Sequence, residues 1–410
     1  MQRRWKRGSA VAALLLVVVG VAAFGASAKG PATTPEGVPI GKACGQVPPA
    51  STPAAVRSLP AAIKSQYLGY PYKVLKSAYA SWKPKHAPPY TVAIDYGPLI
   101  NPWNAYVYNL LPKFLKRSPL VKNVITVTRR SNTDPTESLQ TYNSMVQQKP
   151  DIILVLEGLT SVAKPAIEAA GKSGIPTISM INDFESPYTV SVVPNSFVGV
   201  GETAATILKT LGTANVLFIH AIPGQSSDIN TLNAFKAVLA NCPGSKIVGE
   251  INGFYSPPAT KGATLQFLAT HPEPINYVAT GCCMSIYAVQ AFQQAGRPLP
   301  AASEVSALKA ELGFWNQNKA NYKAAVTIGG GTSFADLVVK TTLRMLAGQG
   351  PKFSSIVWPA PLVTSANLSK YAKPDWTIDT PGTVDNKPVF SDKQLNAFFT
   401  NTGITKGIDY

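Results

Sequence analysis

The sequence has 410 residues, with 37 Lys and Arg against 21 Asp and Glu and a formal net charge of +16. Beyond the N-terminus the basic residues are scattered rather than clustered, and no nucleic-acid-binding motif occurs, so we exclude nucleic acid as a partner. We expect instead a solvated basic surface that is drawn weakly to anionic envelopes. The length is enough for two lobes of ordinary size with extensions.

The first 28 residues have the pattern of a secretory signal peptide. The basic start Met1–Arg7 is followed by an apolar run, Ala10–Phe24, and by Ala26-Ser27-Ala28, so cleavage is expected after Ala28. The apolar run is shorter than the about 20 residues of a membrane span, and an uncleaved anchor is the alternative. We therefore predict an extracytoplasmic protein, in the periplasm or at the cell surface.

Residues 29–88 precede the first buried strand pattern. Residues 29–60 are rich in Pro, Ala and Thr with few large apolar groups, which predicts a spacer with little fixed structure. Leu59–Trp82 is more apolar and aromatic, and we interpret it as a short helical extension that packs on the first lobe.

The chain then alternates between strand and helix patterns. Tyr90–Asp95 has the pattern of a buried strand, and Asn101 followed by Pro102 is a favourable helix start. Val124–Thr128 is the next predicted strand. Asp134–Glu137 has acidic residues at the cap and third helical positions, which indicates a capping box.

The stretch Asp151–Asp183 has the pattern of a strand, a helix and a second strand. Asp151–Leu156 is a continuous apolar run, as in a strand buried on both faces. Gly174 stands where a helix C-terminus favours glycine, and Ile175–Ile181 is a second buried strand pattern. A helix that crosses between two such strands makes them parallel.

Similar units follow. The predicted strands are Thr189–Val193, Asn215–His220, Lys246–Ile251, Tyr277–Thr280 and Ala324–Ile328. The predicted helices are Val198–Leu211, Ile229–Leu239, Pro258–Thr270, Met284–Ala295 and Phe334–Leu346. Repeated units of this kind imply an α/β protein with parallel sheets. Because the strands are too many for one comfortable sheet, two similar lobes are expected.

Several short motifs occur in a characteristic order along this alternation. They are Asn101-Pro102-Trp103, Gly174-Ile175-Pro176, Gly224 with the polar loop Gln225–Thr231, Leu265–Pro272, Gln290–Pro298 and Leu346-Ala347-Gly348. Together they resemble the sugar-class, ribose-type (type I) periplasmic substrate-binding proteins of ABC transporters. The resemblance extends from about Tyr90 to the C-terminus.

The resemblance implies two Rossmann-like lobes with parallel sheets, joined by a three-strand hinge, with the ligand between them. The crossings are expected near Val193–Asn195, Gly329–Gly331 and Val357–Pro359. The N-terminal lobe would comprise residues 89–193 with 330–357, and the C-terminal lobe residues 194–329 with 358–410. Ligand would favour a closed shape that a membrane permease can read.

Candidate ligand-binding residues follow the strands, because ligands of open parallel sheets lie beyond the carboxyl ends of the strands. Trp103 follows the first strand, where it could stack on a sugar face or pack under its loop. Asn101 and Asn104 could bind hydroxyl groups, although Asn101 could equally be a plain N-cap.

The resemblance adds two further groups of residues. Family members usually carry an acidic ligand-binding residue near the position of Asn182-Asp183-Phe184, from which Asp183 is displaced by about two positions. Asp228 and Asn230 open a later helix, where Asp228 could be only a cap. Ribose-type proteins often carry an arginine here, and this chain has none, so a plain aldopentose or hexose is not implied.

Cys282 and Cys283 stand where the family commonly has Asn-Asp. Disulfides are permitted in an exported protein, and four cysteines allow three full pairings. A vicinal Cys282–Cys283 bond would present an apolar, polarizable surface to the cleft, while pairing with Cys242 or Cys44 is the alternative. Trp315 matches an aromatic residue that is often found in the family. It could lie in the core or form part of the cleft wall.

His220 ends a strand of the second lobe and raises two other possibilities. A site made of His220 and both cysteines would suit zinc chemically, but adjacent cysteines are poorly spaced for chelation, so we predict no metal. Cys282 or Cys283 as nucleophile with His220 as base is the only catalytic constellation available, and nothing in the local sequence activates the thiols.

We therefore predict an extracytoplasmic solute-binding protein of an ABC importer, not an enzyme, acting as a monomer without a cofactor. Its partners would be a carbohydrate-like small molecule and a permease in the membrane. No G-x-S-x-G, H-E-x-x-H or P-loop lysine motif argues for catalysis. The alternatives are a ligand-sensing ectodomain that partners a membrane receptor, or a thiol hydrolase.

Overall fold

The computed structural model describes residues 33–158, 161–385 and 388–410. The predicted signal peptide, residues 1–28, lies outside these residues. Within the described ranges, no helix combines the length and the apolar character that a membrane span requires.

The first lobe is built on a six-stranded sheet whose neighbouring strands are all parallel. In sheet order, the strands are β11 (Ser355–Trp358), β5 (Thr189–Pro194), β4 (Thr177–Met180), β3 (Ile152–Leu156), β1 (Tyr90–Tyr96) and β2 (Val121–Thr128). Its longer helices are α2 (Pro102–Leu115), α3 (Pro135–Gln147), α4 (Lys164–Lys172) and α10 (Gly331–Leu346).

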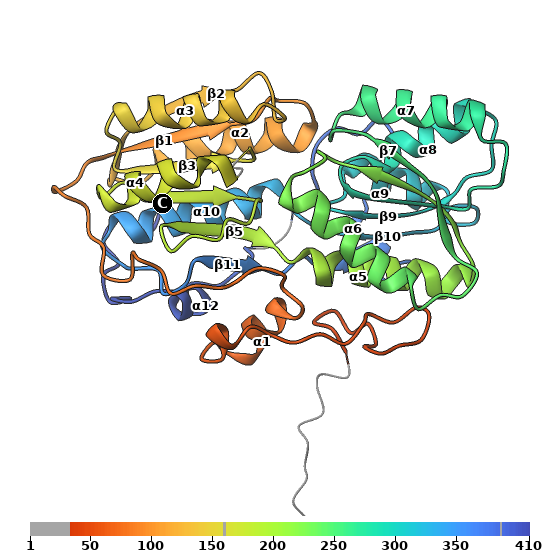
Figure 1. Ribbon diagram of the computed structural model, residues 1–410, viewed down its shortest axis with the longest axis horizontal. Coiled ribbons are helices and arrows are strands. Elements are labelled where there is room, and N and C mark those ends of the chain that lie inside the picture. The colour runs from red at the N-terminus through yellow and green to blue at the C-terminus, as the bar shows by residue number, and fades with distance from the viewer. Residues whose placement is uncertain (1–32, 159–160, 386–387) are drawn as a thin grey trace, which may run out of the picture. The chain divides into compact units, whose positions relative to one another are not determined.

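The central strand β3 shows why a continuous apolar run was needed. Ile152 and Leu154 pack in the core that includes residues of α2 and α10, whereas Ile153 and Val155 pack in the core formed with α3 and α4. Successive side chains of a strand point to opposite faces, so a strand covered by helices on both sides is apolar at every position. Figure 1 shows these helices flanking the sheet.

The second lobe repeats this plan with one antiparallel strand at its edge. In sheet order, the strands are β12 (Leu362–Val363), β10 (Ala324–Thr327), β9 (Ala301–Val305), β8 (Tyr277–Cys282), β6 (Asn215–His220) and β7 (Lys246–Asn252), and only β12 is antiparallel to its neighbour. The helices are α5 (Ser196–Leu211), α6 (Ser226–Leu239), α7 (Pro257–Thr270), α8 (Ser285–Gln294), α9 (Lys309–Gln317) and α11 (Leu368–Tyr371). The predicted fold class is confirmed.

Three passages of the chain join the sheets. β5 ends at Pro194 and continues into α5 of the second lobe, and β10 ends at Thr327 and returns to the first lobe through α10. β11 ends at Trp358, and β12 begins at Leu362 in the second sheet. The ends of β5, β10 and β11 and the start of β12 therefore lie at a common hinge.

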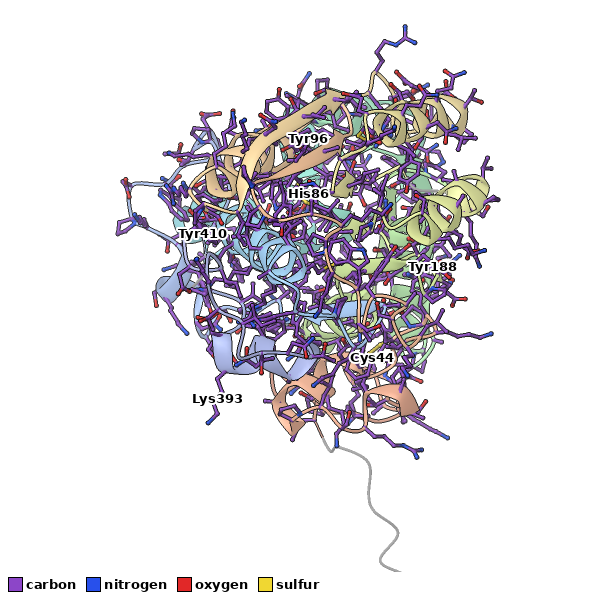
Figure 2. All side chains as sticks on the ribbon, turned by 90° about the vertical axis from the view of Figure 1, so that its left-hand side faces the viewer. Cys44, His86, Tyr96, Tyr188, Lys393 and Tyr410 are labelled. Carbon is purple, nitrogen blue, oxygen red and sulfur yellow. A yellow bond between two sulfur atoms is a disulfide. The ribbon has the colours of Figure 1, made fainter. Side chains whose placement is uncertain are left out.

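The N-terminal segment differs from its prediction as a spacer. Val47 is fully buried in a core of the second lobe, and Cys44 forms a disulfide with Cys242, next to that core. Figure 2 marks Cys44 in this segment. From Val56 to Tyr79 the segment packs into the core of the first lobe, as predicted for Leu59–Trp82, but its helical part is limited to short turns: η1 (Ala54–Val56), α1 (Ala61–Lys64) and η2 (Ser65–Tyr67). Composition misleads here because the disulfide and a few aromatic side chains fix a chain that is poor in apolar residues.

The C-terminal tail also divides between the lobes, whereas residues 358–410 were assigned to the second lobe. Residues from Val363 to Val384 pack in the second lobe. The following residues return to the first lobe: Phe398 is buried in its core, and the Tyr410 hydroxyl donates to Asp336 at 2.6 Å. Figure 2 marks Tyr410 at this end of the chain. The short elements of this stretch are α12 (Asp392–Leu395) and η4 (Asn396–Phe398).

Candidate ligand-binding site

A cavity lies where the carboxyl ends of strands from both sheets meet beside the hinge. The space around it, open solvent at its mouth included, is about 650 Å³. The first lobe contributes Asn101, Trp103, Asn104, Glu157, Ile181 and Asp183. The first crossing contributes Pro194 and Ser196. The second lobe contributes Ser227, Thr231, Tyr255, Gly281, Cys282, Val305 and Ser306.

Backbone conformation marks the same cavity. Four of its lining residues are not glycine but have positive φ: Glu157 (61°), Ile181 (71°), Tyr255 (55°) and Ser306 (59°). Glu157, Ile181 and Ser306 each come directly after a strand, and Tyr255 comes three residues after one. Left-handed backbone at such residues costs about 1–3 kcal/mol each and is concentrated at functional sites. Four such residues around one cavity mark it as the candidate functional site.

The start of α2 brings three predicted residues to the cavity. Asn101 caps the helix, because its side chain accepts from the Asn104 N–H at 2.9 Å. Trp103 is buried and donates from Nε1 to the Gly329 carbonyl at 2.8 Å, so its ring is fixed against the second crossing. The Asn104 amide donates to Glu157 Oε1 at 3.4 Å, while Asn104 Oδ1 is buried with no protein partner.

Glu157 directly follows β3 and is held by two amides, from Asn104 and, at 2.9 Å, from Asn132. Burial raises the pKa of its carboxyl group, against the lowering effect of these amides and of nearby Arg129. Arg129 lies behind the cavity, where it forms a fully buried ion pair with Asp95 at 2.7 Å and donates to the Glu157 carbonyl at 2.9 Å. The positive charge of Arg129 is therefore paired within the first lobe.

Asp183 lines the cavity from the loop after β4. Its carboxylate accepts a hydrogen bond from the hydroxyl of Tyr70, which belongs to the N-terminal segment. Burial raises the pKa of Asp183 to about 7, with a further increase from nearby Glu185, while the hydrogen bond from Tyr70 opposes the shift. This group therefore changes charge close to neutral pH.

The second lobe presents hydroxyl groups and an apolar wall. Ser227, in the first turn of α6, lies 3.3 Å from the Tyr255 hydroxyl. Cys282 lines the cavity and is bonded to Cys283, so the vicinal pairing is the one formed, and Cys44 pairs with Cys242. Beside Cys282 the wall is completed by Gly281 and Val305. Donors and acceptors thus face an apolar, polarizable surface.

Two hydrogen bonds join the lobes beside the start of α6. The Gln225 amide donates to the Asn132 carbonyl at 3.3 Å, and the Asn230 amide donates to the Tyr72 hydroxyl at 2.9 Å. Gln225 is the N-cap of α6, and Asn230 lies within α6. The first contact joins this helix to the first lobe, and the second joins it to the N-terminal segment that packs on that lobe.

The structure brings five of the eleven predicted site residues to the cavity: Asn101, Trp103, Asn104, Asp183 and Cys282. The other six lie elsewhere. Phe184 and Trp315 are in hydrophobic cores, Asn182 is buried next to Asp183, and Cys283 is buried behind Cys282. Asn230 is in the interlobe contact, and Asp228 accepts from the Ala221 N–H at 2.7 Å.

The thiol-hydrolase alternative is contradicted by the bonding of its residues. Cys282 and Cys283 are joined to each other, which leaves neither thiol free. His220 is held between Asp228 and Glu250, at 2.9 Å from each. Among the described residues, no group of three or more His, Cys, Asp or Glu side chains could hold a metal ion.

Several lining residues were missed from the sequence. Glu157 could have been predicted from the sequence, because it directly follows the strand that was predicted up to Leu156. Ser306 could not have been predicted, because the preceding strand β9 has the sequence Ala-Ala-Ser-Glu-Val, which lacks the apolar or β-branched run of a buried strand. Tyr255 follows β7 only after a turn, so the strand pattern alone does not place it.

The lining has a clear chemical character. It includes two carboxyl groups, two amides and several hydroxyls, but no Lys, Arg or His. A site without a cation has nothing to neutralise a buried anion, whose desolvation is costly. The arrangement disfavours an anion and suits a molecule with several hydroxyl groups and some apolar surface.

Two parallel-sheet lobes, joined by three crossings beside a cavity at their strand ends, define the type I periplasmic binding protein fold. The chain belongs to the periplasmic binding protein family: the family model described as "periplasmic binding protein domain" matches residues 98–350. The resemblance inferred from the sequence motifs is confirmed.

Similar proteins include curated and structural relatives. A xylitol-binding protein of Mycolicibacterium smegmatis is 22% identical over 178 residues, a match that spans 43% of this chain and about half, 51%, of the relative. An ABC transporter solute-binding protein of Thermobispora bispora has a TM-score of 0.64 at 20% identity, covering 73% of this chain and 99% of that one. One from Bacillus halodurans with bound myo-inositol has a TM-score of 0.62 at 15% identity, covering 70% and 98%.

Proposed function

We propose that this protein is the extracytoplasmic solute-binding subunit of an ABC importer and binds a neutral polyhydroxylated molecule, a sugar or polyol, in the cavity between its lobes. The bound ligand would favour the closed arrangement, which a permease in the membrane recognises. The protein would act as a monomer outside the cytoplasm.

The observation that carries this proposal is the chemistry of the cavity lining. Asn104 Oδ1 is buried and has no partner in the protein, although buried acceptors are nearly always hydrogen-bonded. A ligand hydroxyl would satisfy it. The lining offers further acceptors on Glu157 and Asp183, donors on the second lobe, and no cation. Xylitol and myo-inositol, the molecules named for two of the relatives, have this chemistry.

The test is a binding screen of the purified protein by thermal shift and titration calorimetry. The panel should contain xylitol, myo-inositol, pentoses and hexoses, with small carboxylates and amino acids as charged comparisons. We expect a neutral polyol or sugar to raise the melting temperature, since a ligand at a hundredfold excess over its Kd stabilises by about 2.7 kcal/mol. Binding of only anionic compounds, or of no compound in the panel, would contradict the proposal.

A matched pair of variants on α2 locates the site. Asn104→Ala removes the unpartnered acceptor and should weaken binding at least about tenfold, because a buried hydrogen bond is lost. Asn109→Ala is the control, because Asn109 is exposed on the same helix and donates to the Ala105 carbonyl. Equal affinities for the two variants would place the ligand elsewhere.

A further inference from the structure

Arg129 lies behind the ligand cavity and is not among the residues that line it. It follows β2 directly, and its side chain is fully buried together with that of Asp95 on β1. A guanidinium has five N–H donors in a planar fork, and it often gives two of them side by side to one carboxylate. Here Asp95 accepts from Nε alone, at 2.7 Å, and its Oδ2 is buried without a partner among the described residues. The two Nη groups are therefore available to other acceptors.

These Nη groups bind three backbone carbonyls at the ends of two strands. Nη2 donates to the carbonyls of Leu156, at 3.1 Å, and Glu157, at 2.9 Å. The two carbonyls belong to the peptide groups on either side of the Glu157 Cα, so one guanidinium fixes both. Nη1 donates to the Ser131 carbonyl at 3.2 Å. Asn132 comes next in the chain, and its amide donates to Glu157 Oε2 at 2.9 Å. Arg129 thus holds both the main chain of Glu157 and the loop that provides one of its amide partners.

Gly158 allows the guanidinium to come this close. Glu157 and Gly158 both have positive φ, 61° and 77°. A Cβ on residue 158 would lie 2.2 Å from Arg129 Nη1, so any larger residue would displace the guanidinium. Left-handed backbone at a residue such as Glu157 persists only where the surrounding structure fixes it. The bonds from Arg129 supply such a restraint at a residue that lines the cavity.

We propose that Arg129 is a positioning residue for ligand binding: its carbonyl bonds hold Glu157 so that the carboxylate accepts hydroxyl groups of the ligand, which Arg129 itself does not touch. This inference rests on the proposed function and adds a determinant of affinity behind the cavity. Asp95 compensates the buried charge of Arg129. The orientation of Glu157 depends on the planar shape of the guanidinium and not only on its charge.

Two variants separate the carbonyl bonds from the ion pair. Arg129→Lys keeps a positive charge that can still pair with Asp95, but one ammonium group cannot reproduce the planar fork on the carbonyls. Asp95→Asn removes the charge of the partner and leaves the guanidinium on the carbonyls, with an amide oxygen still present to accept from Nε. Both variants alter the same buried ion pair, so both are expected to lower the melting temperature. Their affinities for a ligand should differ.

The probes are xylitol and myo-inositol, and affinity is measured by titration calorimetry at a temperature at which every variant is folded. For the probe that binds the wild type more tightly, Arg129→Lys should weaken binding about tenfold, as expected for one lost hydrogen bond to a charged group. Asp95→Asn should stay within about threefold of the wild type, since the carbonyl bonds are kept.

A double-mutant cycle with Glu157→Ala tests whether Arg129 acts through Glu157. Glu157→Ala removes the carboxylate, so adding Arg129→Lys to it should change the affinity by less than about twofold further. A general loosening of the cavity would instead weaken binding by the same factor in both backgrounds. If Arg129→Lys does not fold, the pair Arg129→Gln with Asp95→Asn takes its place in the cycle, because it removes both buried charges together and leaves neither unpaired.

The outcomes separate this inference from the proposed function. If a probe binds the wild type but Arg129→Lys loses no more affinity than Asp95→Asn, this inference fails while the proposed function stands. The same conclusion follows if Arg129→Lys costs the same factor with and without the Glu157 carboxylate. If neither probe binds the wild type, this inference fails, whereas the proposed function is decided by the pentoses and hexoses of its own panel.

Discussion

Asp183 is a cavity residue whose charge can change near neutral pH, because burial raises its pKa to about 7. Its carboxylate form accepts from Tyr70, so this hydrogen bond lowers the pKa against the effect of burial. If a ligand hydroxyl donates to the carboxylate, affinity should fall as the pH drops through this value. Tyr70→Phe removes the donor and should move the midpoint of the pH–affinity curve upward by about 0.5–1 pH unit, the equivalent of one hydrogen bond.

Tyr72→Phe is the control for this prediction. The Tyr72 hydroxyl accepts from Asn230 and makes no hydrogen bond to Asp183, so its loss should weaken interlobe contact without moving the midpoint. Calorimetry at half-unit steps from pH 5.5 to 8.5 would measure both variants. Equal midpoints in Tyr70→Phe and the wild type would mean that Asp183 does not bind the ligand as a carboxylate.

Single residues show both the reach and the limit of sequence reasoning about this site. Trp103 and Asn104 could be predicted as cavity residues because the sequence shows a clear strand, β1, followed closely by the start of a helix, α2. Both residues therefore lie beyond the carboxyl end of a strand. Trp315 could not be placed, because an aromatic residue of an amphipathic helix fits a core as well as a cleft wall, and only the packing decides. Tyr70 carried no signal, since its role depends on how a distant segment lies across the first lobe.

At the scale of elements, the Cys44–Cys242 disulfide holds the N-terminal segment to the second lobe and joins residues separated by 198 positions. A link that closes so long a loop restricts the unfolded chain strongly. The double variant Cys44→Ser with Cys242→Ser should therefore lose about 2–5 kcal/mol of unfolding free energy in urea denaturation.

The other disulfide supplies the matched control. Cys282 and Cys283 are adjacent, so their bond closes almost no loop of the unfolded chain. Cys282→Ser with Cys283→Ser should cost far less stability than the first double variant. If the two double variants lost similar amounts, the N-terminal segment would owe its position to packing rather than to the disulfide.

The elements themselves were predictable wherever local pattern and burial agree. β3, β5, β6 and β10 lie close to their predicted positions because they are almost entirely buried and rich in apolar or β-branched residues. The capping box at the start of α3 is only half present: Asp134 accepts from the Thr136 and Glu137 N–H groups, but Glu137 accepts from Arg130 and Ser131 instead. A loop that folds back onto the helix start decided this, and its course is a tertiary property.

For the whole molecule, buried carboxyl groups make stability depend on pH. Burial raises the pKa of Glu202 to about 7 and of Glu304 to about 8. Because these values lie above those of the unfolded chain, the folded state keeps protons that the unfolded state releases. The free energy of unfolding therefore falls as the pH rises, by about 1.4 kcal/mol per pH unit for each such carboxyl between its unfolded and folded pKa.

The titration of His220 also makes the free energy of unfolding fall as the pH rises. Burial lowers its pKa, but hydrogen bonds and charges from Glu250 and Asp228 raise it by more. Its stabilising charge is fully present below the unfolded pKa of about 6.5 and is lost as the pH rises through the higher folded value. Glu137 and Glu250, whose pKa values are lowered, are already ionised above pH 5.5 and do not oppose the trend.

We therefore expect the melting temperature to fall by several degrees between pH 5.5 and pH 8, measured by calorimetry at constant ionic strength. Glu304 is the group to test, because the interval between its unfolded pKa and its folded pKa of about 8 covers this pH range. Its Oε2 accepts from the Met284 and Ser285 N–H groups at the start of α8. Glu304→Gln keeps an acceptor but cannot ionise, so its melting temperature should fall less steeply with pH. A wild-type melting temperature that stays level or rises over this range would show that these carboxyl groups are not held in their protonated form.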